Sequence, residues 1–351
     1  MANLISVVIF FGMLAGGPTV SRAEEPPKPK KPLFNDGQAI SVSVENDSSR
    51  IGGPGVDQAF SNGLKISYVH ARDQIPKWAP RPVADSSFLK EELKISKVNF
   101  GVSLNHQIYT PNNTNAPQLL SRDRPYAGWL NLAFSIQLKN KHRAQTLDAS
   151  FGMIGPSALG EQVQNGFHRF VGTTTAQGWS HQLGDEPAVQ LSYQQRIQFV
   201  QLRNSSGTYF DLIPVVGAGF GNVLIGIHSG LIARIGWNIP DDFGPARPSA
   251  SETDSFVEAS PTSSKPIKPS FYMFAGARGN GVARNIFLDG NTFRPSHRVT
   301  KYPVTAETEI GFGLQVSPIN VVWRYIVRSP EFEENSGFNS FASVGITYSS
   351  D

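Results

Sequence analysis

The chain has no cysteine and little charge. Of its 351 residues none is Cys, and 17% are Asp, Glu, Lys or Arg. The lack of cysteine excludes disulfides, thiolate nucleophiles and sulfur-ligated metals. The net charge of +3 is small, and no stripe of basic residues interleaved with aromatic residues marks a nucleic-acid surface. We therefore set nucleic-acid partners aside.

Long apolar runs are also missing from most of the chain. The exception is the segment 4–14, which precedes Ser21-Arg22-Ala23 and is too short to span a bilayer as a helix. An apolar segment of this length before small residues is typical of a secretory signal peptide cut after Ala23. We expect a signal peptide at 1–23, and then a Pro/Lys-rich leader at 24–36 that forms no regular structure.

Polar and apolar residues alternate along most of the remaining sequence. In 38–45, for example, Ile40, Val42 and Val44 fall on one side of a strand and the small or polar residues fall on the other. An even number of long amphipathic strands after a signal peptide predicts an all-β fold, a transmembrane antiparallel β-barrel of about twelve strands in the bacterial outer membrane, spanning 37–351. The segments with this pattern are 38–45, 63–70, 97–110, 129–138, 145–154, 188–200, 209–220, 224–237, 271–280, 305–316, 320–328 and 338–348.

The connections between these strands differ in length. The long ones are 72–96, 111–124, 155–186 and 241–270, and we expect them to face outward. The last is rich in Pro and Ser and is most simply a surface insertion with no site of its own.

A short helix is predicted in one of these extracellular loops. Within 155–186, Glu161, Gln164 and His168 recur at steps of three and four, so a helix places all three on one face. A single histidine on a surface helix ordinarily caps or packs it. A porin would explain the barrel but would leave this segment without a role, and a soluble β-sandwich seldom needs strands this long.

A series of short motifs runs along most of the mature chain. They are Glu45-Asn46-Asp47, Asp57 to Gly63, Gln107 to Pro111, Asp123 to Trp129, Gly155-Pro156, Leu159-Gly160, Gln164 with His168, Gly178-Trp179 and Asp185-Glu186-Pro187. Together they resemble the lipid A 3'-O-deacylase family, although Ala59-Phe60 replaces a more usual Arg-Tyr or Tyr-Tyr pair and 241–270 is enlarged. The resemblance implies an outer-membrane barrel of twelve strands that removes the 3'-linked acyloxyacyl chain of lipid A. The implied partners are lipopolysaccharide and outer-membrane lipids, and no protein partner is implied.

Ester hydrolysis needs an activated nucleophile and a group that stabilises the oxyanion. Without cysteine the choices are a serine activated by histidine, or a water activated by histidine with a cation that polarises the carbonyl. No Gly-x-Ser-x-Gly elbow precedes a helix, which favours water, although barrel lipases can use a serine without that motif. Asn46 and Asp47 offer oxygen ligands of the kind that Ca²⁺ prefers, or they simply end a strand in a turn. The resemblance implies His168 as the base and calcium at Asp47.

Other residues are candidates with simpler alternatives. Gln164 orients the imidazole, contacts a substrate carbonyl or simply lies on a solvated helix face. Glu186 either joins the cation site or begins the next strand. Arg124 either meets a phosphate or anchors its loop. The full set of expected site residues is His168, Gln164, Asn46 and Asp47 for catalysis, Asp47, Asn46 and Glu186 for the metal, and Ser61, Asn62, Arg124, Tyr126 and Lys65 for substrate. The rival functions are a non-catalytic barrel, porin or structural, and a phospholipase with a serine nucleophile.

Overall fold

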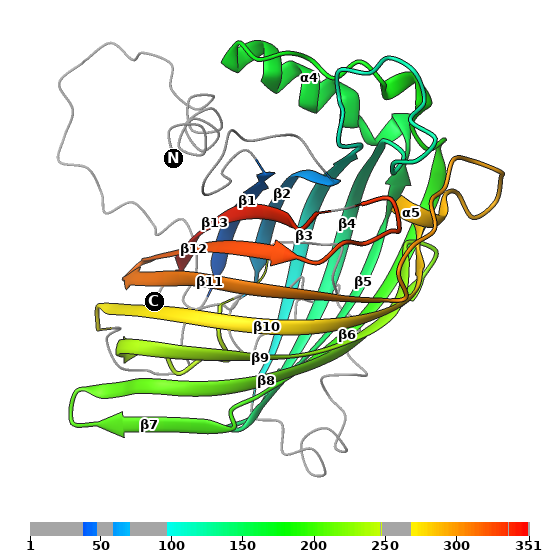
Figure 1. Ribbon diagram of the computed structural model, residues 1–351. Coiled ribbons are helices and arrows are strands. Elements are labelled where there is room, and N and C mark those ends of the chain that lie inside the picture. The colour runs from blue at the N-terminus through cyan, green and yellow to red at the C-terminus, as the bar shows by residue number, and fades with distance from the viewer. Residues whose placement is uncertain are drawn as a thin grey trace, which may run out of the picture.

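The computed structural model describes residues 38–47, 59–70, 97–245, 247, 268–335 and 337–349. The expected signal peptide and leader lie outside these residues. The described part of the chain forms one antiparallel sheet of 13 strands, which Figure 1 shows as a tilted barrel. The strands are β1 (Ala39–Asn46), β2 (Ala59–Val69), β3 (Lys97–Thr110), β4 (Ala127–Lys139), β5 (Arg143–Ile154), β6 (Glu186–Ile197), β7 (Val200–Asn204), β8 (Gly207–Gly221), β9 (Leu224–Ile239), β10 (Ser270–Asn285), β11 (Val304–Val316), β12 (Ile319–Arg328) and β13 (Asn339–Ser349).

Two pairings close the sheet into a ring. β1 pairs with β13, and β6 pairs directly with β8 from Gln190 opposite Gly221 to Arg196 opposite Val215. The strand β7 therefore stays outside the ring as one arm of a hairpin with β8. Twelve strands make the closed barrel, as the alternation predicts, and β7 is an addition that the sequence pattern did not separate from β6.

The alternation of side chains along each strand gives the barrel an apolar outer wall and a polar interior. Along β11 every second residue is exposed, and the large exposed side chains include Ile310, Phe312 and Leu314. The residues between them are buried and include Glu307 and Glu309. An apolar exterior around a polar interior is what a barrel in lipid requires. Among the described residues no helix is both long and apolar enough to cross a membrane.

The strand ends correct one expectation about the loops. Val69 at the end of β2 pairs with Ala39 at the start of β1, which also pairs with Ser349 at the end of β13. Successive connections of an antiparallel meander alternate between its two ends. Strand β2, which precedes 72–96, and strand β9, which precedes 241–270, therefore end at the side of the barrel where β1 begins and β13 ends. The connections 111–124 and 155–186 leave from the other side, so the four long connections do not all face one way.

A short helix fills the barrel mouth at the side where 155–186 leaves. The helix α5 (Ile286–Asp289) follows β10, and its side chains Ile286 and Phe287 are buried. The ring of Phe287 stacks on Tyr109 with 3.8 Å between ring centroids and lies 6.1 Å from the ring of Trp129. This apolar cluster packs inside the upper ends of the strands.

The opposite half of the interior is filled by the start of the β9–β10 connection. Nη1 of Arg196 donates to the main-chain oxygens of Phe243, Gly244 and Pro245 at 3.0, 3.2 and 3.1 Å. The guanidinium of Arg234 pairs with Asp242 at 2.5 Å. The expectation that 241–270 is only a surface insertion is therefore wrong for its first residues, which fold into the barrel because arginines on β6 and β9 hold them. Residues 248–267 lie outside the described part of the chain.

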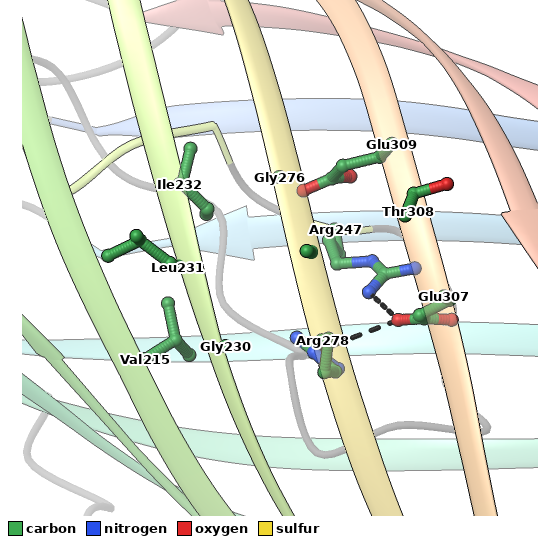
Figure 2. Close-up of a pocket in the computed structure, with 11 residues that line it drawn as sticks. Val215, Gly230, Leu231, Ile232, Arg247, Gly276, Arg278, Glu307, Thr308 and Glu309 are labelled. Carbon is green, nitrogen blue, oxygen red and sulfur yellow. Dashed lines mark hydrogen bonds and ion pairs between the residues drawn. The ribbon is translucent and has the colours of Figure 1, made fainter.

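Arginine and glutamate side chains occupy the middle of the interior. Figure 2 shows Arg247, from the same connection, and Arg278, from β10, both pointing toward Glu307 on β11. Arg328 pairs with the other carboxylate oxygen of Glu307 at 3.2 Å. Buried charges are stable only when they are paired in this way. These paired side chains thus occupy the middle of the interior.

Candidate functional site

A cavity of about 510 Å³ lies between the outer face of the barrel wall and the helix α4 (Gly160–Val171). We call it the helix cavity. Figure 1 shows α4 beyond the upper ends of the neighbouring strands. Strands β1 to β4 supply one side of the cavity, and α4 with the short turn before it supplies the other. The lining residues are Val44, Asn46, Asn62, Leu64, Leu104, His106, Ile108, Leu130, Ala158, Leu159, Gln162, Val163, Gln164, Gly166, Phe167, His168 and Phe170.

Two glycines let the helix approach the wall closely. A Cβ on Gly128 of β4 would lie 3.1 Å from the main-chain nitrogen of Gly160, and a Cβ on Gly160 would lie 2.6 Å from the ring of Trp179. Neither position has room for a side chain, so the first turn of α4 rests directly against β4. The helix ends at Gly172, which has the left-handed conformation that favours glycine there. The helix expected in 155–186 is thereby confirmed.

His168 lies one helical turn after Gln164 and lines the cavity with it. Its Nδ1 is 2.7 Å from the main-chain oxygen of Thr174. A carbonyl oxygen only accepts, so Nδ1 carries the hydrogen and donates it. In the neutral ring Nε2 is then the nitrogen that carries the lone pair, which is what a general base uses to take a proton.

The segment that carries Thr174 is fixed to the helix by Asn165. The side-chain amide of Asn165 donates to the oxygen of Ala176 at 3.0 Å, and the nitrogen of Ala176 donates back to Asn165 Oδ1 at 2.8 Å. The nitrogen of Thr173 donates to the oxygen of His168 at 2.9 Å. These bonds hold the acceptor of His168 in place, so the ring has one supported orientation.

Gln164 is buried, and a tryptophan that follows the helix in the chain holds its side chain. Nε1 of Trp179 donates to Gln164 Oε1 at 2.9 Å. The Trp179 ring in turn packs against Tyr126, with 4.9 Å between their centroids, and the Tyr126 hydroxyl donates to the oxygen of Thr114 at 3.3 Å. Tyr126 therefore supports the helix and does not line the cavity. Glu161, expected on the same helix face, is exposed and does not line it either.

Asn46 and Asn62 lie side by side on the wall. They are directly opposed in the pairing of β1 with β2, and both line the helix cavity. Asp47 follows Asn46 and is buried, with 4% of its surface exposed. The side chain of Ser61 lies outside the described part of the structure, so its expected contact with substrate stays a prediction.

A second histidine lines the cavity, and sequence reasoning missed it. His106 on β3 is buried, and its Nε2 donates to the oxygen of Ala158 at 2.8 Å. Ala158 belongs to the 3-10 turn Pro156–Ala158 just before α4, so this bond ties the wall to the start of the helix. A signal existed in the sequence, because His106 stands between Leu104 and Ile108 on the face of β3 that otherwise presents apolar side chains.

Lys65 and Arg124 are not brought to the cavity. Lys65 is buried and stands on the opposite face of β2 from Asn62, because the two residues are an odd number of positions apart. Arg124 is 1% exposed and pairs with Glu331 at 3.2 Å, and its guanidinium lies 5.4 Å from the ring centroid of Tyr109. Arg124 thus anchors its loop inside the barrel, which is the simpler of its two alternatives.

Glu186 also lies away from the cavity. Its Oε1 accepts from the amide of Asn222 at 3.0 Å, and its Oε2 accepts from the amide of Asn291 at 3.0 Å and the nitrogen of Thr292 at 2.8 Å. These bonds join β6 to the neighbouring loops and engage both oxygens with neutral donors. Glu186 does not line the helix cavity, and its expected role as a metal ligand stays a prediction.

Of the expected calcium ligands, Asn46 lines the helix cavity and Asp47 does not. Asn46 and Asp47 together carry amide and carboxylate oxygens, which suit this cation. Among the described residues no group of three or more His, Asp or Glu side chains is placed to hold a metal ion. Calcium at Asn46 and Asp47 stays a prediction, and its other ligands would be main-chain oxygens, water or substrate.

Ser157, in the 3-10 turn just before α4, is hydrogen-bonded to a carboxylate. The hydroxyl of Ser157 donates to Asp185 Oδ2 at 2.9 Å, and its nitrogen donates to Oδ1 of the same carboxylate at 2.7 Å. Ser157 does not line the helix cavity. No histidine bonds to its hydroxyl, so Ser157 does not have the arrangement of an activated nucleophile.

The comparisons with known proteins agree with this architecture. The family model described as "Outer membrane protein LpxR" matches residues 5–350. The chain belongs to this family. The resemblance to the lipid A 3'-O-deacylases is thereby confirmed, and so is an integral position in the outer membrane.

The fold is also similar to that of a solved barrel. LpxR from Salmonella typhimurium is 18% identical and superposes with a TM-score of 0.71 over 89% of this chain and 99% of its own. The β domain of the Bordetella autotransporter BrkA is 10% identical, with a TM-score of 0.42 over 89% of this chain and 98% of its own. The curated proteins give no match. The LpxR-family barrel, with its helix beside the wall, is the fold of this chain.

Proposed function

We propose that this protein is an outer-membrane esterase that removes the 3'-linked acyloxyacyl chain of lipid A. The observation that carries the proposal is the hydrogen bond from His168 Nδ1 to Thr174, which leaves Nε2 as the basic nitrogen in a cavity beside the barrel wall. Membership of the LpxR family supports the same substrate.

The position of the cavity suits a substrate that stays in the membrane. Leu104 and Leu130 extend the apolar outer wall into it, and Val163 and Phe170 on α4 are apolar and exposed. A lipid with its acyl chains in the outer leaflet would reach His168 sideways, without leaving the bilayer. The polar groups of the cavity then meet the sugar and the ester at the upper ends of the strands.

In the proposed reaction, Nε2 of His168 takes a proton from a water molecule as its oxygen attacks the ester carbonyl. The tetrahedral intermediate collapses by breaking the bond to the sugar oxygen, and the imidazolium returns the proton to that oxygen. The products are a free 3'-hydroxyl and the released acyloxyacyl acid. The side-chain amide of Asn62, on the wall of the cavity, supplies a hydrogen-bond donor for the oxyanion.

Asn46 and Asp47 would hold calcium next to this site. Bound there, the cation supplies Lewis-acid polarisation of the carbonyl. Trp179 holds the side chain of Gln164, and Ala176 holds that of Asn165. These contacts keep α4 and His168 in position beside the wall.

Mass spectrometry of lipid A from cells with and without the protein tests the proposal. Expression should produce a species lighter by one acyloxyacyl group, and the glycerophospholipids should stay unchanged. Lysophospholipids with intact lipid A would instead favour a phospholipase. Unchanged lipids of both kinds in cells with a correctly inserted barrel would favour a non-catalytic one.

A further inference from the structure

A second hollow lies on the outer wall below the helix cavity. It measures about 690 Å³ and is lined by residues of β3, β4, β5, β6 and β8. Aromatic rings surround it, namely Phe100, Phe134, Phe151 and Phe220, and the small residues Ala149 and Ala218 leave the room between them. We call it the wall hollow.

The wall hollow continues the surface of the helix cavity. On β4, Leu130 lines the cavity and Phe134 lines the hollow, about 13 Å further along at roughly 3.3 Å per residue. Only Leu132 stands between them on the outward face. Leu132 pairs on one side with Leu104 of the cavity and on the other with Phe151 of the hollow. A continuous row of apolar side chains therefore joins the helix cavity to the wall hollow.

We infer that the wall hollow is a subsite for an acyl chain of the lipid whose ester is cleaved in the helix cavity. The inference rests on the proposed function and adds a specificity determinant to it. A chain that descends from the cavity along the bilayer normal crosses from strand to strand, because the strands of outer-membrane barrels are tilted by about 35–45°. Such a chain passes from β3 and β4 toward the strands that line the hollow.

The side chains that line the wall hollow are of the kind that binds an acyl chain. Phe134, Phe151, Leu191 and Phe220 are large, apolar and exposed on the face that meets lipid. The polar side chains at the same level, such as Asp148 bonded to Ser135, belong to the interior face of the wall. A saturated hydrocarbon chain is the ligand that such a surface holds, and the end of the hollow limits its length.

Filling the hollow should change chain-length selectivity. In Ala149→Phe a ring occupies the space, so kcat/KM should fall about tenfold or more for lipid A with long acyl chains and stay unchanged for short-chain lipid A, since a few methylene groups in an apolar pocket discriminate by roughly 10–200-fold. The matched control is Ala275→Phe, which adds the same ring at an exposed position of β10, a strand outside the hollow. Equal chain-length profiles in both variants would overturn the inference, while the activity of the unaltered protein in the same assay reports separately on the proposed function.

Binding can be measured without turnover. The chain has no cysteine, so Ala149→Cys and Ala275→Cys each accept one fluorophore in the His168→Ala background. In detergent micelles, lipid A with brominated acyl chains should quench the label at position 149 saturably and the label at position 275 weakly. Equal quenching at both positions, or equal quenching at position 149 by a brominated phospholipid, would show that the hollow holds only bulk lipid.

Discussion

The imidazole of His168 donates from Nδ1 to the main-chain oxygen of Thr174 across 2.7 Å. This single bond decides which ring nitrogen can act as a base. The acceptor is held by two hydrogen bonds between Asn165 and Ala176, so the arrangement depends on the loop after α4 as much as on the helix.

The first prediction concerns pH. As pH falls, Nε2 of His168 takes up a proton and can no longer accept one from water, so kcat/KM for lipid A should decrease on the acid side of the profile. Asn165→Ala should lower activity across the profile because the Thr174 segment loses its attachment. A rate that stays constant while the imidazole becomes charged would contradict the base role.

The second prediction concerns calcium. Chelation should abolish turnover, and calcium should restore it better than magnesium, whose strict octahedral geometry two adjacent protein ligands satisfy poorly. Asp47→Ala should weaken the response to calcium. Glu186→Gln should keep it, because both carboxylate oxygens of Glu186 already accept hydrogen bonds from Asn222, Asn291 and Thr292. Full activity in excess chelator would remove the cation from the mechanism.

The third prediction compares two glycines of one helix. A Cβ at position 160 would lie 2.6 Å from the Trp179 ring, whereas a Cβ at position 166 meets nothing within 4 Å. Gly160→Ala should displace α4 at a cost of about 1–3 kcal/mol, change the near-ultraviolet circular dichroism of Trp179 and reduce activity. Gly166→Ala should stabilise the helix by about 1 kcal/mol. If both variants change the Trp179 signal alike, the close contact with the wall does not position the helix.

The fourth prediction separates this barrel from a porin. Phe287 packs against Tyr109 in one mouth, and Arg196 holds the segment 243–245 inside the other half. Between these segments, the ion pairs of Glu307 with Arg247 and Arg328 occupy part of the interior. The purified protein should therefore give no open-channel steps in planar bilayers. A steady conductance of porin size would show that these segments do not block the interior.

Much of the architecture follows from the sequence because a barrel wall imposes period two along every strand. All twelve strands of the ring were predicted in this way. The strand β7 was not, since five residues at a hairpin edge carry too little alternation. The inward fold of 241–247 depends on Arg196 and Arg234, which are distant along the chain, so local pattern could not reveal it.

The helix cavity was only partly predictable. Asn46, Asn62, Gln164 and His168 were named from motifs, and the structure brings them to one cavity. Strand parity could have separated Lys65 from Asn62 and could have drawn attention to His106 among apolar neighbours. The buried position of Arg124 beside Glu331 depends on a contact with the loop between β12 and β13, which the sequence does not specify.

The fifth prediction is the most direct test of the account. Purified protein and its His168→Ala variant are incubated with lipid A and calcium, and the products are followed by mass spectrometry. The unaltered protein should release the 3'-acyloxyacyl acid. The variant should be about a hundredfold to ten-thousandfold slower, the usual contribution of a general base, while it keeps the folded barrel because α4 lies outside the strands. Equal release by a folded His168→Ala variant, or an acyl group trapped covalently on a serine, would contradict the account.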